Sequence, residues 1–364
     1  MNRYQVLPVD ERYNDTMIDI VRNSPIHAGG MTLYFDKSPD LFRTSELAYS
    51  GCRHLGFFAD NELKGFASLG YREAIINGLL QTIFTFYNFY ILPEARGMHF
   101  PEKAARIFLQ EASEKAKYGY YITMKGNRNV ESFVIRQNHP WSPPYGIADE
   151  LVVKSIIFSF PFKNTTKYKV RNATANDIPE IVRLLNGEQG QRDFGKRTSE
   201  EEFEHSLEKR SLSPANYYVA ENSKGNIKGV CLAWDCSSFR RTIVERFSYK
   251  FYPLLYTYRL LAHIIPMAPF PLAGERFNEL TITDYAAEDR DINVMHALLA
   301  EIYYRNLNRK YHFMNFASCR NDDLLKAAKG FLHLDIISNI IVFNNNSEQP
   351  DYTIRLPYID IAGL

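Results

Sequence analysis

An internal repeat constrains the fold of this chain more than any other sequence feature. Residues 54–71 contain an aromatic stretch, a polar turn and a Leu-Lys-Gly sequence that opens a second apolar stretch, and residues 216–234 repeat this pattern with Ile-Lys-Gly. Residues 118–124 and 311–316 also match in character, and each follows a helical pattern and precedes an Asn-containing turn. Two matches in the same order predict two tandem copies of one fold.

The length of the chain is consistent with two domains. The chain has 364 residues, whereas single hydrophobic cores stop growing near about 250–300 residues. We therefore expect domains at 1–165 and 166–364, divided in the polar stretch 163–167.

The 43 Lys and Arg nearly balance the 42 Asp and Glu, for a net charge of +1. This balance argues against a non-specific nucleic-acid binder, so no nucleic-acid partner is expected.

The cysteine pattern indicates reduced thiols and no metal site. The four cysteines are Cys52, Cys231, Cys236 and Cys319. They form no Cys-x-x-Cys pair, and no histidine cluster lies near them in the sequence.

Charges follow directly after the first residues, and the most apolar region, 251–274, is interrupted by Arg259, His263 and prolines. We therefore expect no signal peptide, no transmembrane segment and a cytoplasmic location.

In the first copy, apolar periodicity and turn signals predict alternating strands and helices. The expected helices are 12–23, 101–117 and 129–137. The expected strands are 54–60, 63–73, 79–92 and 119–124, and two more within 146–162. Asn77-Gly78 predicts a two-residue hairpin, because both central positions of a type I′ turn need positive φ. The strand 79–92 is nearly all apolar, which predicts burial on both faces.

The second copy begins near Tyr168 and repeats the order of elements. The expected helices are 177–186, 200–209, 292–309 and 322–330. The expected strands are 216–222, 227–235, 277–285, 311–318, 334–343 and 351–359. An insertion, 239–276, separates two strands that form a tight hairpin in the first copy.

The most informative segment is 91–101, Ile-Leu-Pro-Glu-Ala-Arg-Gly-Met-His-Phe-Pro, between the apolar strand and a helix. Backbone N–H groups and the helix dipole can hold a phosphate at such a junction. The segment resembles the acyl-CoA loop of the GNAT acyltransferase superfamily, and the order of elements in both halves is similar to that fold. The resemblance covers essentially the whole chain. It implies an α/β (α+β) protein with two tandem GNAT-like domains, each a mixed, mainly antiparallel twisted sheet flanked by helices.

The resemblance also implies an activity and a binding site. The activity is transfer of an acyl group from acetyl-CoA, or from another acyl-CoA, to a primary amine on a small molecule or a peptide. The groups that would face the CoA pyrophosphate are Arg96 and the backbone of Gly97, Met98, His99 and Phe100. The backbone that would pair with the pantetheine arm belongs to Phe89, Tyr90 and Ile91. The residue where the arm enters would be Asn127 or Asn129.

The loop departs from the family pattern in both copies. The family has small residues where the first copy has His99 and Pro101, and a proline lacks one N–H donor. The corresponding stretch of the second copy, 284–292, has no glycine, and it has Glu288, Asp289 and Asp291 where two phosphates would lie. Like charges repel where two phosphates would bind. We therefore expect the site in the first copy and a second copy without a CoA site.

Catalytic groups are harder to assign. Acyl transfer needs the acceptor amine in its neutral form, so a base is expected. The family often has a Glu on the strand before the loop and a Tyr in the helix after the next strand, and this chain has neither at the matching positions. The substitute candidates are Tyr87, Glu73, His99 and Tyr145.

Other interpretations stay open. A catalytically decayed GNAT fold that acts as a binding or interaction protein would explain the missing catalytic residues. An aminoacyl transferase that uses charged transfer RNA resembles the same fold, although the net charge of +1 counts against it. The aromatic insertion 239–276 is interpreted first as a lid packed between the copies, and otherwise as an acyl-chain tunnel or a membrane contact. The sequence leaves open the acceptor, the acyl length and the oligomeric state.

Overall fold

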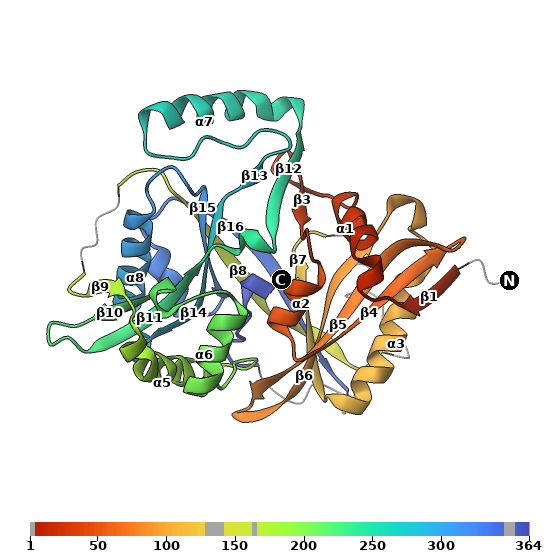
Figure 1. The fold of residues 1–364 in the computed structure, drawn as a ribbon, viewed down its shortest axis with the longest axis horizontal. Coiled ribbons are helices and arrows are strands. Elements are labelled where there is room, and N and C mark those ends of the chain that lie inside the picture. Colours follow the sequence, from red (N-terminus) through yellow and green to blue (C-terminus); the bar gives the residue numbers. More distant parts are fainter. Residues whose placement is uncertain (1–3, 128–141, 162–165, 346–353, 364) are drawn as a thin grey trace.

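The computed structural model describes residues 4–127, 142–161, 166–345 and 354–363. Within these residues, twelve strands form one large mixed sheet in the order β1-β4-β5-β6-β7-β16-β8-β15-β14-β11-β10-β9, with helices packed on it (Figure 1). A smaller sheet has the order β13-β12-β3-β2. We call residues 4–161 the first half and residues 166–363 the second half.

The first half contains three helices and eight strands in its described part. The helices are α1 (Asn14–Arg22), α2 (Phe42–Ala48) and α3 (Phe100–Lys115). The strands are β1 (Tyr4–Pro8), β2 (Ile26–Ala28), β3 (Met31–Asp36), β4 (Gly51–Ala59), β5 (Glu62–Ile76), β6 (Leu79–Ile91), β7 (Tyr118–Met124) and β8 (Tyr145–Ile157).

The described residues of the second half form the remaining elements. The helices are α5 (Ile178–Gln189), α6 (Glu200–Lys209), α7 (Tyr252–Ile264) and α8 (Ile292–Arg305), with a 3-10 segment at Asp323–Ala328. The strands are β9 (Lys169–Asn172), β10 (Tyr217–Glu221), β11 (Ile227–Trp234), β12 (Arg241–Phe247), β13 (Arg276–Phe277), β14 (Glu279–Ala287), β15 (Phe313–Cys319) and β16 (His333–Asn344).

The predicted mixed, mainly antiparallel sheet is confirmed. Only β6–β7 in the first half and β14–β15 in the second half pair in parallel within the described sheet. The hairpin at residues 77–78 is also confirmed, because Asn77 and Gly78 both have positive φ between β5 and β6. Capping side chains fix the starts of two helices. Thr174 and Asp177 form a capping box before α5, and Ser199 and Glu202 form one at α6.

Several expected elements differ from the structure. One strand, β8, replaces the two expected within 146–162. Residues 354–360 form no strand, and 323–328 form a 3-10 segment rather than a longer helix. The expected helix 129–137 lies outside the described residues. β6 is buried at 83–85, but its last four residues are partly accessible, so burial along both faces was wrong for this end of the strand.

The two halves exchange strands at the middle of the sheet. β16 of the second half lies between β7 and β8, and pairs antiparallel with both. β8 of the first half in turn pairs with β15. The exchange satisfies backbone groups that would otherwise form two exposed sheet edges. The boundary near 163–167 stays a prediction, since residues 162–165 lie outside the described part.

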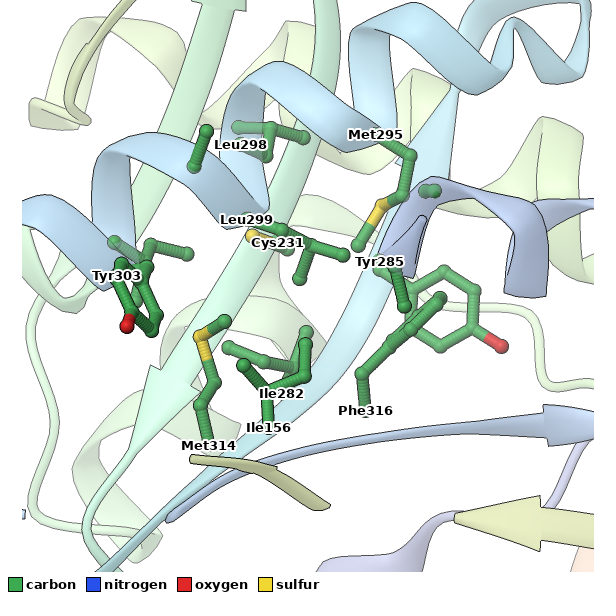
Figure 2. Packing of buried hydrophobic residues seen from close by; sticks show 14 of the residues in the cluster. Ile156, Cys231, Ile282, Tyr285, Met295, Leu298, Leu299, Tyr303, Met314 and Phe316 are labelled. Atoms are coloured by element: carbon green, nitrogen blue, oxygen red, sulfur yellow. The ribbon is translucent and has the colours of Figure 1, made fainter. Parts of the chain in front are cut away.

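The exchange also joins the two cores. Figure 2 shows α8 side chains, among them Met295 and Leu299, over β14 and β15, where they meet Ile282 and Met314. Ile156 of β8 belongs to the same buried cluster, although it comes from the first half. The first half has its own core, in which α3 packs on the sheet.

A glycine under an aromatic ring gives a test of this packing. A Cβ on Gly119 of β7 would come within 2.3–2.4 Å of three ring carbons of Phe84 on β6. We expect Gly119→Ala to lower the free energy of unfolding by about 1–3 kcal/mol, because the ring is fully buried and must shift. The matched control is Gly146→Ala on β8, where a Cβ meets nothing within 4 Å. Equal denaturation midpoints for the two variants would contradict the packing.

Candidate functional site

The candidate site begins where two parallel strands of the first half separate. β6 and β7 pair from Ile83 and Tyr118 to Phe86 and Tyr121, and no pairing continues beyond these residues. Just beyond the last pair, the β5–β6 register shifts at a bulge, and Asn88 takes a positive φ of +52°. A bulge bends the strand and increases its twist, so β6 turns away from β7.

A cleft of about 980 Å³ opens at this separation. Neighbouring β6 side chains point to opposite faces of the sheet: Phe86 stacks on Phe108 of α3, whereas Tyr87 contacts Tyr49 on the other face. Residues from both faces line the cleft, including Ala104 and Leu109 on α3 and residues 24–27 after α1. The cleft therefore passes between the two strands from one face of the sheet to the other.

One end of the cleft lies at the start of α3. Arg96, Gly97 and Pro101 line it there. Gly97 has φ of +84°, a conformation that glycine adopts without strain, and a Cβ at this position would meet nothing within 4 Å. Phe100 is fully buried and stacks on Phe57 with ring centroids 5.1 Å apart, which fixes the first turn of the helix.

The charge at this end is positive. Arg96 is exposed and forms no ion pair with any described carboxylate. The first N–H groups of a helix lack partners inside the helix, and its N-terminus carries a partial positive charge. None of the described residues that line the cleft is an Asp or Glu. This end can therefore bind an anion.

The structure brings most of the predicted site residues together. The predicted residues that line the cleft are Tyr87, Phe89, Tyr90, Ile91, Arg96, Gly97, Asn127 and Tyr145. Met98 packs against the core and Phe100 lies within it. Asn129 lies outside the described residues.

Two catalytic candidates do not reach the cleft. Glu73 is exposed on β5 opposite Thr82, at the hairpin end of the strand and away from the separated end of β6. His99 is exposed, and its Nδ1 lies 3.8 Å from Oε2 of Glu102. Both residues were substitute candidates for the missing base, but Glu73 lies at the far end of β5 and the backbone at His99 is left-handed, with its side chain exposed.

Polar groups beneath the cleft were missed by the sequence analysis. Ser68 lines the cleft, and its hydroxyl lies 2.8 Å from Nδ1 of the buried His54. Nζ of Lys37 donates a 2.5 Å hydrogen bond to Oδ1 of Asn88 at the bulge. Ser68, His54 and Asn88 lie on three different strands and Lys37 directly follows β3, so no motif or spacing connects them.

Burial shifts the acid–base properties of these groups. Burial, with a smaller contribution from Arg240, lowers the pKa of Lys37 to about 7. Burial and the nearby Lys37 lower the pKa of His54 to about 4. Burial raises the pKa of both Tyr87 and Tyr145, so both phenols are protonated at neutral pH.

Buried ionic side chains occupy part of the equivalent region in the second half, and a smaller pocket of about 380 Å³ there reaches Asp284. β14 and β15 also separate, after Ile282 and Phe316. The guanidinium of Arg192, fully buried, donates to Glu188 at 2.7 Å, to Ser318 at 3.1 Å and to Asp322 at 2.5 Å.

The second loop is also satisfied internally. Arg290 contacts Glu188 and Asp322, and so extends the buried ionic cluster. Glu288 pairs with Arg183 at 3.2 Å and with Lys228. Asp291 caps α8 and accepts a hydrogen bond from Tyr168. Glu288 and Asp291 thus have partners within the protein, and the expectation that the second copy lacks a CoA site stays a prediction.

The insertion differs from the expected lid. β12 pairs with β3 of the first half, so the insertion joins the two halves through a strand. The inner face of α7 packs on this smaller sheet through Leu255. Its outer face is exposed, and α7 lies along the rim of the molecule rather than between the copies (Figure 1).

Comparisons with known proteins identify the fold. No family model and no curated protein matches the sequence. A GCN5-related N-acetyltransferase from Sphaerobacter thermophilus is similar in structure, with 12% identity, a TM-score of 0.59, and coverage of 100% of this chain and 99% of that one. N-myristoyltransferase of Saccharomyces cerevisiae with bound myristoyl-CoA has 12% identity, a TM-score of 0.60, and coverage of 96% and 84%. A GCN5-related N-acetyltransferase from Kribbella flavida has 13% identity, a TM-score of 0.52, and coverage of 93% and 70%.

These similarities cover nearly the whole chain and confirm the GNAT-type fold expected from the sequence. At 12–13% identity they establish the fold alone.

No described helix is long and apolar enough to cross a membrane. Among the described residues, no group of three or more His, Cys, Asp or Glu is placed to hold a metal ion.

The buried ionic cluster predicts a strong dependence on Asp322. Burial by itself raises the pKa of Asp322. Arg192, Ser318 and Arg290 together lower it by more than burial raises it, so the pKa lies below its ordinary value of about 3.9. We expect Asp322→Asn to lower the free energy of unfolding by about 3–5 kcal/mol, because Arg192 and Arg290 would then share Glu188 alone and one buried positive charge would be left without compensation. The matched control is Asp323→Asn, which removes an exposed pair with Lys326 and should change little.

The same carboxylate sets an expected pH dependence. Because its folded pKa is lowered, its stabilisation is complete above about pH 4 and is lost as the pH falls through the folded pKa. Urea unfolding between pH 7 and pH 3 should therefore show a smaller loss of stability in Asp322→Asn than in the unchanged chain. Parallel pH profiles would contradict this assignment.

Proposed function

We propose that the first-half cleft binds an acyl-CoA and transfers its acyl group to an amine. The observation that carries this proposal is the cleft at the separated ends of β6 and β7, which passes between the two strands from face to face. Such a passage allows a donor to enter from one face and an acceptor from the other. N-Acyltransferases among the structural neighbours share this fold.

The ends of the cleft fit the parts of an acyl-CoA. The pyrophosphate would lie at the start of α3, near Arg96 and the positive end of the helix dipole. The β6 backbone beyond Phe86 has no β7 partner and can form hydrogen bonds with the amides of the pantetheine arm. The apolar rings of Phe89 and Phe108 would line the arm.

The reaction needs few charged groups from the protein. The neutral amine nitrogen attacks the thioester carbonyl, the new C–N bond forms, and the C–S bond breaks to release the CoA thiolate. A cleft whose described lining has no carboxylate favours the neutral amine, because desolvation lowers the pKa of an ammonium group. Tyr145 lines the cleft and is protonated at neutral pH, so it can give its proton to the thiolate, and the proton that the amine nitrogen loses on forming the amide returns to the phenolate through solvent.

A binding protein without turnover is the second candidate. The absence of a carboxylate base among the described lining residues favours this candidate. Release of free CoA thiol with a panel of primary amines separates the two. Steady release supports the transferase, whereas tight acyl-CoA binding without release supports the binding protein.

Arg96 provides the first test. We expect Arg96→Ala to weaken acetyl-CoA binding by roughly tenfold or more, because a charge-assisted hydrogen bond to phosphate contributes about 1.5–3 kcal/mol. The measurement is isothermal titration calorimetry, with an expected stoichiometry of one ligand per chain. Arg106→Ala is the matched control, since Arg106 lies on α3, directly after the loop that carries Arg96, but pairs with Glu102 and is not among the residues that line the cleft. Equal losses in both variants would contradict a specific role of Arg96.

Tyr145 provides the second test. We expect Tyr145→Phe to lower kcat by about 10²–10⁴-fold, the usual range for a general acid, with an unchanged Kd for acetyl-CoA. Tyr304→Phe, at an exposed position on α8, is the control. An unchanged kcat in Tyr145→Phe would remove Tyr145 from the proposed reaction but would leave acyl-CoA binding untouched.

A further inference from the structure

The exposed face of α7 is the largest apolar feature that the proposed function does not use. Eight large apolar or aromatic side chains between 249 and 272 are exposed, including Tyr249 at 78%, Leu260 at 65% and Ile264 at 76%. The buried face of α7 is apolar too, with Leu255 and Ala262. A helix that is apolar all round is normally covered on every side.

We propose that α7 docks on the surface of a membrane that contains anionic lipids, and lies in the plane of the interface. The helix has thirteen residues, so it is about 20 Å long, shorter than the roughly 30 Å hydrocarbon core of a bilayer. It lies along the rim of the molecule, away from the large sheet (Figure 1). It can therefore meet a flat surface without rearrangement of the fold.

The charges around the helix indicate which surface it meets. The segment 245–276 contains Arg246, Lys250, Arg259 and Arg276 against Glu245 and Glu275, so it carries an excess of two positive charges, although the whole chain has a net charge of only +1. Arg246 and Lys250 are exposed, and neither they nor Arg259 form an ion pair with a described carboxylate. Their charges are therefore available to lipid phosphates.

The side chains also suit an interface better than a protein core. Tyr249, Tyr252 and Tyr256 combine an apolar ring with a polar hydroxyl, and they alternate with leucine and isoleucine along the exposed face. Such rings sit well where hydrocarbon meets water. A second copy of this chain is a poorer occupant, because symmetric pairing through α7 would bring two positive surfaces together.

The test uses the full chain and vesicles without acyl-CoA, so it does not depend on the proposed function. Co-sedimentation is measured with vesicles of phosphatidylcholine alone and with vesicles that also contain phosphatidylglycerol. We expect binding to the mixed vesicles, weaker binding to phosphatidylcholine, and a decrease at high salt. The double variant Leu260→Gln with Ile264→Gln should weaken binding to the mixed vesicles by about tenfold or more.

Controls distinguish this surface from general stickiness. The matched variant is Leu79→Gln with Leu334→Gln, which removes two equally exposed apolar side chains elsewhere and should leave vesicle binding unchanged. Lys250→Gln should reduce the preference for anionic vesicles and leave the thermal midpoint unchanged. The proposal is overturned by no binding to either vesicle, by equal effects of both double variants, or by a dimer in sedimentation velocity that only the α7 variants dissociate.

Discussion

The backbone hydrogen bonds of β8 and β16 hold the two halves of the chain in one sheet, and the candidate site depends on them. β16 covers the edge of β7 with pairs from Ser338 to Asn344. It also carries Phe343 into the lining of the first-half cleft. The cleft is therefore built by both halves, although its anion-binding end belongs to the first. A fragment that ended near residue 161 would lose this wall and expose the edge of β7.

The two copies share a positive-φ residue at the point where their parallel strands separate, but the side chain at that residue differs. In each, a positive-φ residue lies where the parallel strands part, Asn88 on β6 and Asp284 on β14, and each accepts a hydrogen bond from a lysine. Asp284 carries a charge, and after the opposing effect of burial its pKa is lowered by Lys196 and Arg210. Asn88 is neutral, so Lys37 has no such compensation, and burial lowers its pKa to about 7. The second copy thereby becomes a stable ionic core, whereas the first keeps an open cleft.

Charged and apolar side chains are also distributed unevenly over the surface. A net charge of +1 describes an almost neutral molecule, whereas residues 245–276 around α7 carry four Lys or Arg and two Glu. The small sheet places this helix at the rim because β12 pairs with β3 of the other half. The sequence of the insertion is rich in tyrosine and leucine, as a buried core would be. The structure places some of these side chains on a buried face and others on an exposed face.

The sequence alone determined the repeat, most elements and the loop before α3, because apolar periodicity, Asn77-Gly78 and the capping residues act locally. It also determined that the first loop carries an arginine followed by a glycine, Arg96-Gly97. Only the tertiary structure decided the strand exchange, because each final strand pairs with residues more than a hundred positions away. It likewise decided which polar groups meet beneath the cleft and which face of α7 is left uncovered, because these depend on contacts between distant elements that no spacing in the chain records.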